Sequence, residues 1–133
     1  MRHLIAGADS NTMPEKLPIL RIRIALGPNM IFGPGKADLL EHIAATGSIS
    51  AAARNMRMSY KRAWQLVDDM NHFFRSALVT TAAGGARGGG AGLTPAGKRA
   101  LACYRALQRH AQVAAKRELS TLERMLPRRS RTA

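Results

Sequence analysis

The sequence predicts a mainly α-helical fold with a small β component, and three observations lead to this fold class. Apolar residues recur at helical spacing in two consecutive runs within residues 48–71. A glycine-rich stretch at 82–91 lies between two short runs of β-type residues, which indicates a hairpin with an extended tip. A third helical pattern extends from residue 95 to residue 126.

The first run begins at Ser48, whose hydroxyl can cap a helix by accepting a hydrogen bond from an early backbone N–H group. The apolar positions that follow share one helical face: Ile49, Ala52, Ala53 and Met56. Short alanine side chains let a second helix approach closely. This run therefore predicts the first member of a crossed helix pair.

The second run follows a turn at Arg57-Met58, and Ser59 is its expected cap. Apolar residues again define one face: Ala63, Leu66, Val67 and Met70. Polar and basic side chains gather near the start of this helix and partly off that face: Tyr60, Lys61, Arg62 and Gln65.

Such a layout suits a helix that enters a DNA groove with its donors pointing outward. The capping residues Ser48 and Ser59 are expected to contact DNA together with these side chains. Arginine and lysine reach guanine or phosphate, Gln65 can pair with adenine, and a helix N-terminus favours phosphate. Asp68 and Asp69 come two turns later and would repel phosphate, so the second half should leave the groove. An ordinary helical hairpin with a solvated basic face is the alternative.

The glycine-rich stretch is expected to form a wing beside this helix pair. Residues 78–81 predict one strand and residues 92–94 the return strand. Arg87 is the charge at the tip, where it would enter a minor groove or clamp a phosphate. A loop without contacts is the alternative, and a nucleotide site is rejected because no Gly-Lys-Ser/Thr closes the stretch.

Before the helix pair, alternation from Leu20 to Leu26 predicts a half-buried strand, with a return strand at residues 30–32. Residues 36–46 predict a helix that Gly47 ends in a left-handed conformation. The inner stripe of that helix is expected to be Ala37, Leu40, Ile43 and Ala44. Trp64, Phe73 and Phe74 are expected to pack in the core.

The last helix should begin with Thr94 as its cap and Pro95 in its first turn. A continuous helix to Leu126 would be roughly 45–50 Å long, more than one small domain can bury. A homodimer seam is therefore expected along its apolar face. The seam residues are Leu101, Tyr104, Leu107, Ala111, Leu119 and Leu122.

Together these residues resemble a known family. The runs 47–54 and 58–64, the glycine-rich 84–91 and the run 93–97 are similar to the DNA-binding domain of the ModE family of molybdate-responsive regulators, and more distantly to LysR-type regulators. The resemblance covers roughly residues 17–107. It implies a winged helix-turn-helix that binds operator DNA as a dimer, and a link to molybdenum metabolism.

Full-length members of that family carry a C-terminal molybdate-binding region, whereas this sequence ends at Ala133. Molybdate sensing is therefore not carried over from the resemblance, and no cofactor is expected in this chain. Molybdate stays an alternative ligand, as an oxyanion held between basic helices. Four parts are expected: a flexible tail at 1–16, the winged domain at 17–94, the C-terminal helix at 95–126 and a basic tail at 127–133.

Composition favours a polyanionic partner. The chain has 133 residues, with 21 Lys and Arg against 8 Asp and Glu, a formal net charge of +13. So large an excess indicates nucleic acid, and double-stranded DNA is the expected partner. Sequence-specific regulation of transcription, most simply repression, is the leading hypothesis, and non-specific architectural binding is the alternative.

Several function classes are not expected. The single cysteine, Cys103, excludes an intramolecular disulfide. No apolar run approaches the length of a membrane span, and the cytoplasm is the simplest location. The four histidines are scattered and no acid–base or nucleophile arrangement can be argued, so an enzyme and a metal site are not expected.

Overall fold

The structure is a computed structural model that describes residues 17–82 and 90–128. The described residues form five helices and two antiparallel hairpins, which confirms the predicted fold class. The first hairpin pairs β1 (Ile24–Gly27) with β2 (Met30–Phe32), and the second pairs β3 (Val79–Ala82) with β4 (Gly90–Leu93). The predicted tail at 1–16, Arg87 and the end of the chain from 129 lie outside the described residues.

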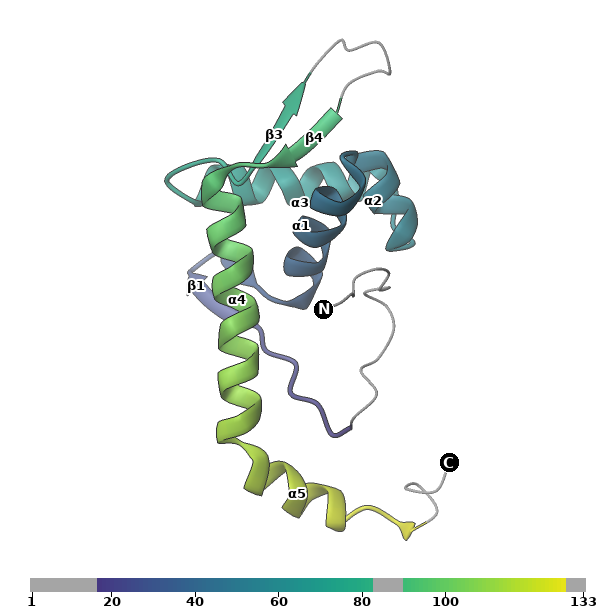
Figure 1. The fold of residues 1–133 in the computed structure, drawn as a ribbon, viewed down its shortest axis with the longest axis vertical. Helices are drawn as coiled ribbons and strands as arrows, with labels where there is room; N and C mark the ends of the chain where they lie inside the picture. The colour runs from purple at the N-terminus through teal and green to yellow at the C-terminus, as the bar shows by residue number, and fades with distance from the viewer. Residues whose placement is uncertain (1–16, 83–89, 129–133) are drawn as a thin grey trace.

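Three helices pack together between the hairpins: α1 (Pro34–Thr46), α2 (Ile49–Asn55) and α3 (Tyr60–Phe73). The β3–β4 hairpin projects beyond this group, and α4 (Pro95–Ala114) runs from the base of the hairpin along the opposite direction (Figure 1). The last helix, α5 (Lys116–Arg124), turns away from the end of α4. The described residues therefore form a helix-turn-helix with a wing and a helical extension.

Three aromatic rings in the core connect the first hairpin, the end of α3 and α4. The Phe32 ring makes edge-to-face contacts with Phe74, at 6.0 Å between centroids, and with Tyr104, at 5.4 Å. These rings bring together β2, the end of α3 and the middle of α4. The largest fully buried side chains are Leu39, Leu40, Ile43, Val67, Met70 and Leu78.

Local signals in the sequence place the helix ends correctly. The side-chain oxygens of Ser48, Ser59 and Thr94 accept hydrogen bonds, each 3.0 Å long, from the backbone N–H groups of Ala51, Arg62 and Gly97. Gly47 ends α1 with φ +73°, the left-handed conformation that was predicted. The start of α1 comes two residues earlier than expected, because Pro34 fits the first turn of a helix.

The predicted strand from Leu20 is wrong in its first half, since β1 begins only at Ile24. Residues before it lie along α4 instead of pairing in a hairpin. The Gln112 side chain accepts a hydrogen bond from Leu20 N–H (2.8 Å) and donates one to the carbonyl of Pro18 (2.9 Å). The Tyr104 hydroxyl donates to the carbonyl of Ile22, and burial raises the pKa of this phenol.

Two core predictions need correction. Phe73 is 46% exposed at the last position of α3, whereas Phe74 takes an extended backbone (φ −85°, ψ 150°) that returns its ring to the core. In α1, Ala44 is exposed and Leu39 is buried, because β2, β4, α2 and α4 all pack around this helix. Trp64 is half-buried and packs against the core, as predicted.

The C-terminal helix is not continuous. Ala115 (φ −94°, ψ 9°) lies between α4 and α5, and the chain bends there (Figure 1). The bend turns the inner side of α5, with Leu119 and Ser120, toward the N-terminal segment at 17–21. No proline or glycine marks this position, so the local sequence does not predict the break.

Candidate nucleic-acid interface

The α2–α3 turn fixes how the second helix is presented. Arg57 N–H donates to the carbonyl of Arg54 (3.1 Å), and Met58 N–H donates to that of Ala53 (3.0 Å). Arg57 itself has φ +57°. Met58 is half-buried against the core, so the turn is held both by hydrogen bonds and by packing.

The two faces of α3 have opposite character. Its inner face buries the four apolar residues predicted for it: Ala63, Leu66, Val67 and Met70. Its first two turns expose the polar and basic residues predicted to meet DNA: Tyr60, Lys61, Arg62 and Gln65. The structure thus brings these four side chains together at the N-terminal end of one helix. The Tyr60 ring, 54% exposed, stands edge-to-face with Trp64 at 6.3 Å.

The two capping serines belong to this end of the domain. Ser59 immediately precedes α3, and its hydroxyl oxygen is engaged with Arg62 N–H. Ser48 caps α2, and its backbone also exchanges hydrogen bonds with the Thr46 hydroxyl, at 3.2 and 3.0 Å. The hydroxyl oxygen of each serine accepts the capping hydrogen bond. The hydroxyl proton can therefore still be donated to another group, such as a phosphate oxygen.

The base of the wing is attached to both helices. Ala91 N–H donates to the carbonyl of Gly47 (2.9 Å), which joins β4 to the start of α2. The Asn71 side chain in α3 makes three hydrogen bonds to the backbone of Leu78 and Val79 at the start of β3. The wing is therefore set in a fixed position relative to α3. Arg87 at its predicted tip lies outside the described residues.

Charge along this surface changes sign within α3. Between Arg54 and Arg62 the chain carries four exposed cations and no acidic residue. Asp68 and Asp69 follow on the exposed side of the next turns, and Asp68 lies 3.5 Å from His72. The positive potential is thus concentrated at the N-terminal part of α3, as a helix that enters a groove by that end requires.

Lys36 connects this charge pattern to α1. Its ammonium donates to the carbonyl of Ile31 (2.8 Å). Burial lowers its pKa, the nearby Asp69 carboxylate opposes that shift, and Arg62 and Arg23 add to it. Lys36 therefore lies within electrostatic range of both Asp69 and Arg62 of α3.

Two cations of this region were missed by the sequence reasoning. Arg54, in the last turn of α2, donates to the Ser50 hydroxyl (3.2 Å), and Arg57 occupies the turn. Both are exposed. Their position next to the predicted recognition helix is visible in the sequence and could have indicated a role in DNA binding. The turn was predicted only as the link between the two helices.

The predicted seam residues differ in their exposure. Tyr104 is buried in the core of its own protomer, where it bonds to Ile22, and Leu101 packs against the same core. Ala111 and Leu119 are half-buried, whereas Leu107 and Leu122 are 36% and 61% exposed. The bend at Ala115 separates α5 from the line of α4, so only part of the predicted stripe is available to another chain.

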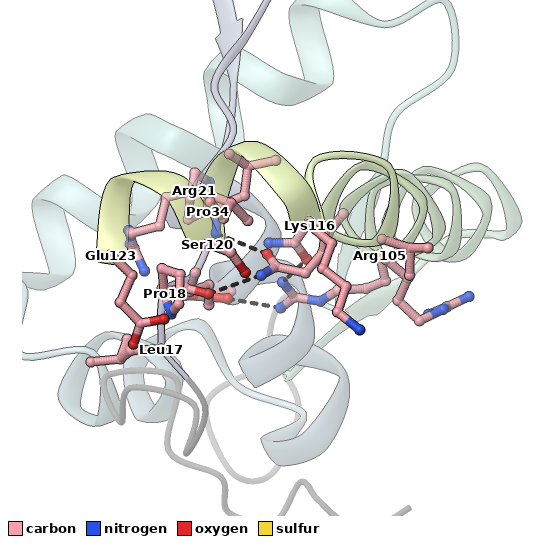
Figure 2. Close-up of a pocket in the computed structure, with 16 residues that line it drawn as sticks. Leu17, Pro18, Arg21, Pro34, Arg105, Lys116, Ser120 and Glu123 are labelled. Atoms are coloured by element: carbon pink, nitrogen blue, oxygen red, sulfur yellow. Dashed lines mark hydrogen bonds and ion pairs between the residues drawn. The ribbon is translucent and has the colours of Figure 1, made fainter. Parts of the chain in front are cut away.

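A groove of about 860 Å³ lies between the N-terminal segment, α4 and α5 (Figure 2). Its lining includes Leu17, Pro18 and Arg21 of the N-terminal segment together with Lys116, Ser120 and Glu123 of α5.

Arg105 forms part of the same groove. Its Nη2 lies 2.7 Å from Asp38 Oδ1 and 2.6 Å from Glu41 Oε1, which ties α4 to α1. Burial raises the pKa of the Asp38 carboxyl above its ordinary value, while Arg105 pulls it in the opposite direction. This ion pair is a structural connection between helices.

Two features are absent from the part of the chain that the structure describes. Residues 17–82 and 90–128 contain no cluster of three His, Cys, Asp or Glu side chains that could hold a metal ion. None of the helices formed by these residues is long and apolar enough to cross a bilayer.

Comparison with known proteins agrees with this geometry. Residues 36–98, from α1 to the first turn of α4, match the family described as "Bacterial regulatory helix-turn-helix protein, lysR family". Residues 36–98 form a LysR-type helix-turn-helix domain. The match includes α2, the turn, α3 and the wing, and therefore every described residue predicted to contact DNA.

The LysR-type domain is homologous to part of several molybdenum-associated proteins. The chain is 50% identical over 76 residues to the molybdenum-pterin-binding protein MopB of Rhodobacter capsulatus, covering 57% of this chain and 28% of that protein. It is 40% identical over 83 residues to the DNA-binding transcriptional dual regulator ModE of Escherichia coli K12, covering 62% of this chain and 32% of that protein. It is 49% identical over 70 residues to the molybdenum transport protein ModE of Azotobacter vinelandii, covering 53% and 26%.

These relatives are longer proteins, and the chain spans about a third or less of their length. The shared part makes up 53–62% of this chain. The predicted resemblance to ModE regulators is confirmed for this segment.

Proposed function

We propose that this protein is a sequence-specific DNA-binding regulator of transcription, acting as a repressor. One observation carries the proposal: Lys61, Arg62 and Gln65 are exposed together on the first two turns of α3 in a LysR-type domain. Side chains at this end of a recognition helix reach base edges when the helix lies in the major groove. A regulator of this kind acts on the chromosome, and we therefore place it in the cytoplasm.

The link to molybdenum metabolism is a second part of the proposal. It is supported by relatives whose names connect them with molybdenum: MopB, and ModE from Azotobacter vinelandii. We propose that the genes controlled by this regulator serve molybdenum metabolism, and that molybdate is the oxyanion to test as its effector.

Binding-site selection with the purified protein tests the central proposal. Random duplexes would be selected at about 150 mM salt, with and without molybdate. The expected result is a palindromic motif with half-sites about one helical turn apart. Recovery of no motif, with affinity that only falls as salt rises, would favour non-specific architectural binding. A molybdate-dependent change in affinity would support the effector.

The Arg62→Ala variant then tests the assigned helix. We expect its preference for the selected duplex over random duplex to fall roughly 5- to 100-fold, the range for one lost base contact. Arg117→Ala is the matched control, because Arg117 is an exposed arginine on α5 and should leave the preference unchanged. An unchanged preference in Arg62→Ala would contradict the role of α3.

We also propose that the regulator is a homodimer joined through α4 and α5. Apolar side chains are exposed along this extension, with Val113 and Met125 each 74% exposed and Leu126 51% exposed. Burying them against a second copy would remove this surface from water. Sedimentation should show a dimer for the wild type and a monomer for Leu122→Asp, whereas Glu118→Asp should stay dimeric.

A further inference from the structure

Arg57 takes a backbone conformation that an arginine rarely adopts. Within residues 17–82 and 90–128 it is the one residue other than glycine with a positive φ, at +57°. Glycine occupies such positions without steric cost, and asparagine tolerates them better than longer side chains do. The turn imposes this conformation, since hydrogen bonds from Arg57 and Met58 to the end of α2 hold it. The backbone at this position therefore gives no reason for an arginine.

Contacts of the side chain within the fold do not explain why position 57 is an arginine. Arg57 is exposed, and its guanidinium makes no hydrogen bond or ion pair with any residue that the structure describes. A strained, exposed and unpaired arginine contributes nothing to folding that glycine would not. An unusual backbone conformation of this kind points to a role in function.

Its surroundings indicate that role. Arg57 lies two residues before Ser59, which caps α3, and it is flanked by Arg54 on α2 and Lys61 on α3. All three cations are exposed, with no acidic residue between them. The turn lies outside α3 itself, so Arg57 is placed beside, and not on, the helix that is proposed to face the bases. In a duplex, the sugar-phosphate backbone borders the groove in which a recognition helix lies.

We infer that Arg57 is a phosphate-contacting residue that clamps the DNA backbone at the edge of the groove occupied by α3. This inference rests on the proposed DNA-binding function and adds a residue to it. A phosphate contact positions the protein without reading sequence, so Arg57 should add equally to the affinity for every duplex. Its contribution should also depend on salt, because each phosphate that is neutralised releases counterions.

The test compares Arg57→Gly with the wild type on two fluorescent duplexes, the selected site and a random sequence, across a series of salt concentrations. We expect Arg57→Gly to bind both duplexes roughly fivefold more weakly at 150 mM salt, with the slope of log K against log salt smaller by about 0.9. Its thermal midpoint should equal or exceed that of the wild type, because glycine accepts a positive φ. Arg57→Lys should recover most of the affinity and the slope.

Arg117→Gln is the control for the loss of one positive charge far from the turn, and it should keep the wild-type slope. Wild-type affinity and slope in Arg57→Gly would overturn this inference alone. So would a loss in Arg57→Gly confined to the selected duplex, since a phosphate contact does not discriminate sequences. If the wild type bound neither duplex, the proposed function itself would fail, and the role of Arg57 with it.

Discussion

Asn71 and Val79 exchange two hydrogen bonds across the junction of α3 and β3. Asn71 Nδ2 donates to the carbonyl of Val79 at 3.0 Å, and Val79 N–H donates to Asn71 Oδ1 at 3.1 Å. The same Oδ1 accepts a bond from Leu78 N–H at 2.8 Å. One side chain thus joins α3 to the wing, and the angle between these two elements depends on it.

Replacing Asn71 with alanine should therefore weaken both folding and DNA binding. Three hydrogen bonds are lost and partly buried backbone groups are left unpaired, so we expect the free energy of unfolding to fall by about 2–3 kcal/mol. Urea unfolding measures this change. Asn71→Asp is the control, because it keeps the two accepted N–H bonds and loses only the donor, and should be affected less. Equal losses in the two variants would contradict this account.

Gly97 in α4 is required by its close approach to the end of the wing. A Cβ at this position would lie 2.1 Å from the backbone oxygen of Leu78, and neither backbone can move without disturbing β3 or α4. We expect Gly97→Ala to lower the free energy of unfolding by about 3 kcal/mol or more, the upper range for a forced clash.

Gly35→Ala is the matched control for this substitution. A Cβ on Gly35, in the first turn of α1, would meet no atom within 4 Å. Alanine favours a helix more than glycine does, so this variant should be as stable as the wild type or slightly more stable. Thermal unfolding of both variants tests the pair, and a Gly97→Ala protein as stable as Gly35→Ala would contradict the clash.

The Arg105–Asp38 pair should make stability depend on pH. Burial already raises the folded-state pKa of Asp38, and Arg105 counteracts this, so Arg105→Met should raise that pKa further. When the pKa of a carboxyl group is higher in the folded protein than in the unfolded protein, its protonated form stabilises the fold. This stabilisation is fully present below the pKa of the unfolded protein and is lost as the pH rises through the pKa of the folded protein. We expect Arg105→Met to cost about 1–3 kcal/mol at pH 7, since the pair is only partly buried, and less at about pH 4.

Chemical unfolding at the two pH values measures the difference. Arg109→Met is the control, because Arg109 is an exposed arginine one turn further along α4. That variant should show a small change that is the same at both pH values. A deficit in Arg105→Met that does not shrink on acidification would mean that the cost comes from packing and not from the charge on Asp38.

Local rules were enough to predict the parts of the fold that depend on neighbouring residues. The caps at Ser48, Ser59 and Thr94 and the left-handed Gly47 need only the sequence within one or two turns. The inner face of α3 followed from helical spacing alone. For the same reason the exposed cluster at the start of α3 could be predicted before the structure was known.

Contacts distant in sequence account for what could not be predicted. Alternating residues from Leu20 suggested a strand, but Gln112 and Tyr104, more than 80 positions away, hold this segment along α4. The bend at Ala115 is a different case, because no proline or glycine marks it and α5 buries no residue that would explain it. The left-handed backbone of Arg57 was not visible in the sequence, because a positive φ is a property of the folded turn.

Ser59 allows helix capping and DNA binding to be separated. Its hydroxyl accepts the 3.0 Å bond from Arg62 N–H, so Ser59→Ala should lower the free energy of unfolding by about 1 kcal/mol. Aspartate also caps helices and its charge is favourable at a helix N-terminus, so Ser59→Asp should be as stable as the wild type. The added negative charge would, however, face phosphate at the start of α3, and duplex affinity should fall although the fold is intact.

Unfolding in urea and duplex titration on the same samples give the two quantities. Asn29→Asp places an equal charge on the exposed turn between β1 and β2, outside the proposed dimer surface and away from the start of α3, and should leave duplex affinity almost unchanged. If Ser59→Asp bound duplex as tightly as Asn29→Asp, the N-terminus of α3 would not lie against phosphate, and the orientation proposed for the recognition helix would be wrong. If Ser59→Asp were instead as unstable as Ser59→Ala, weaker binding could be assigned to a frayed helix, which is why both measurements are needed.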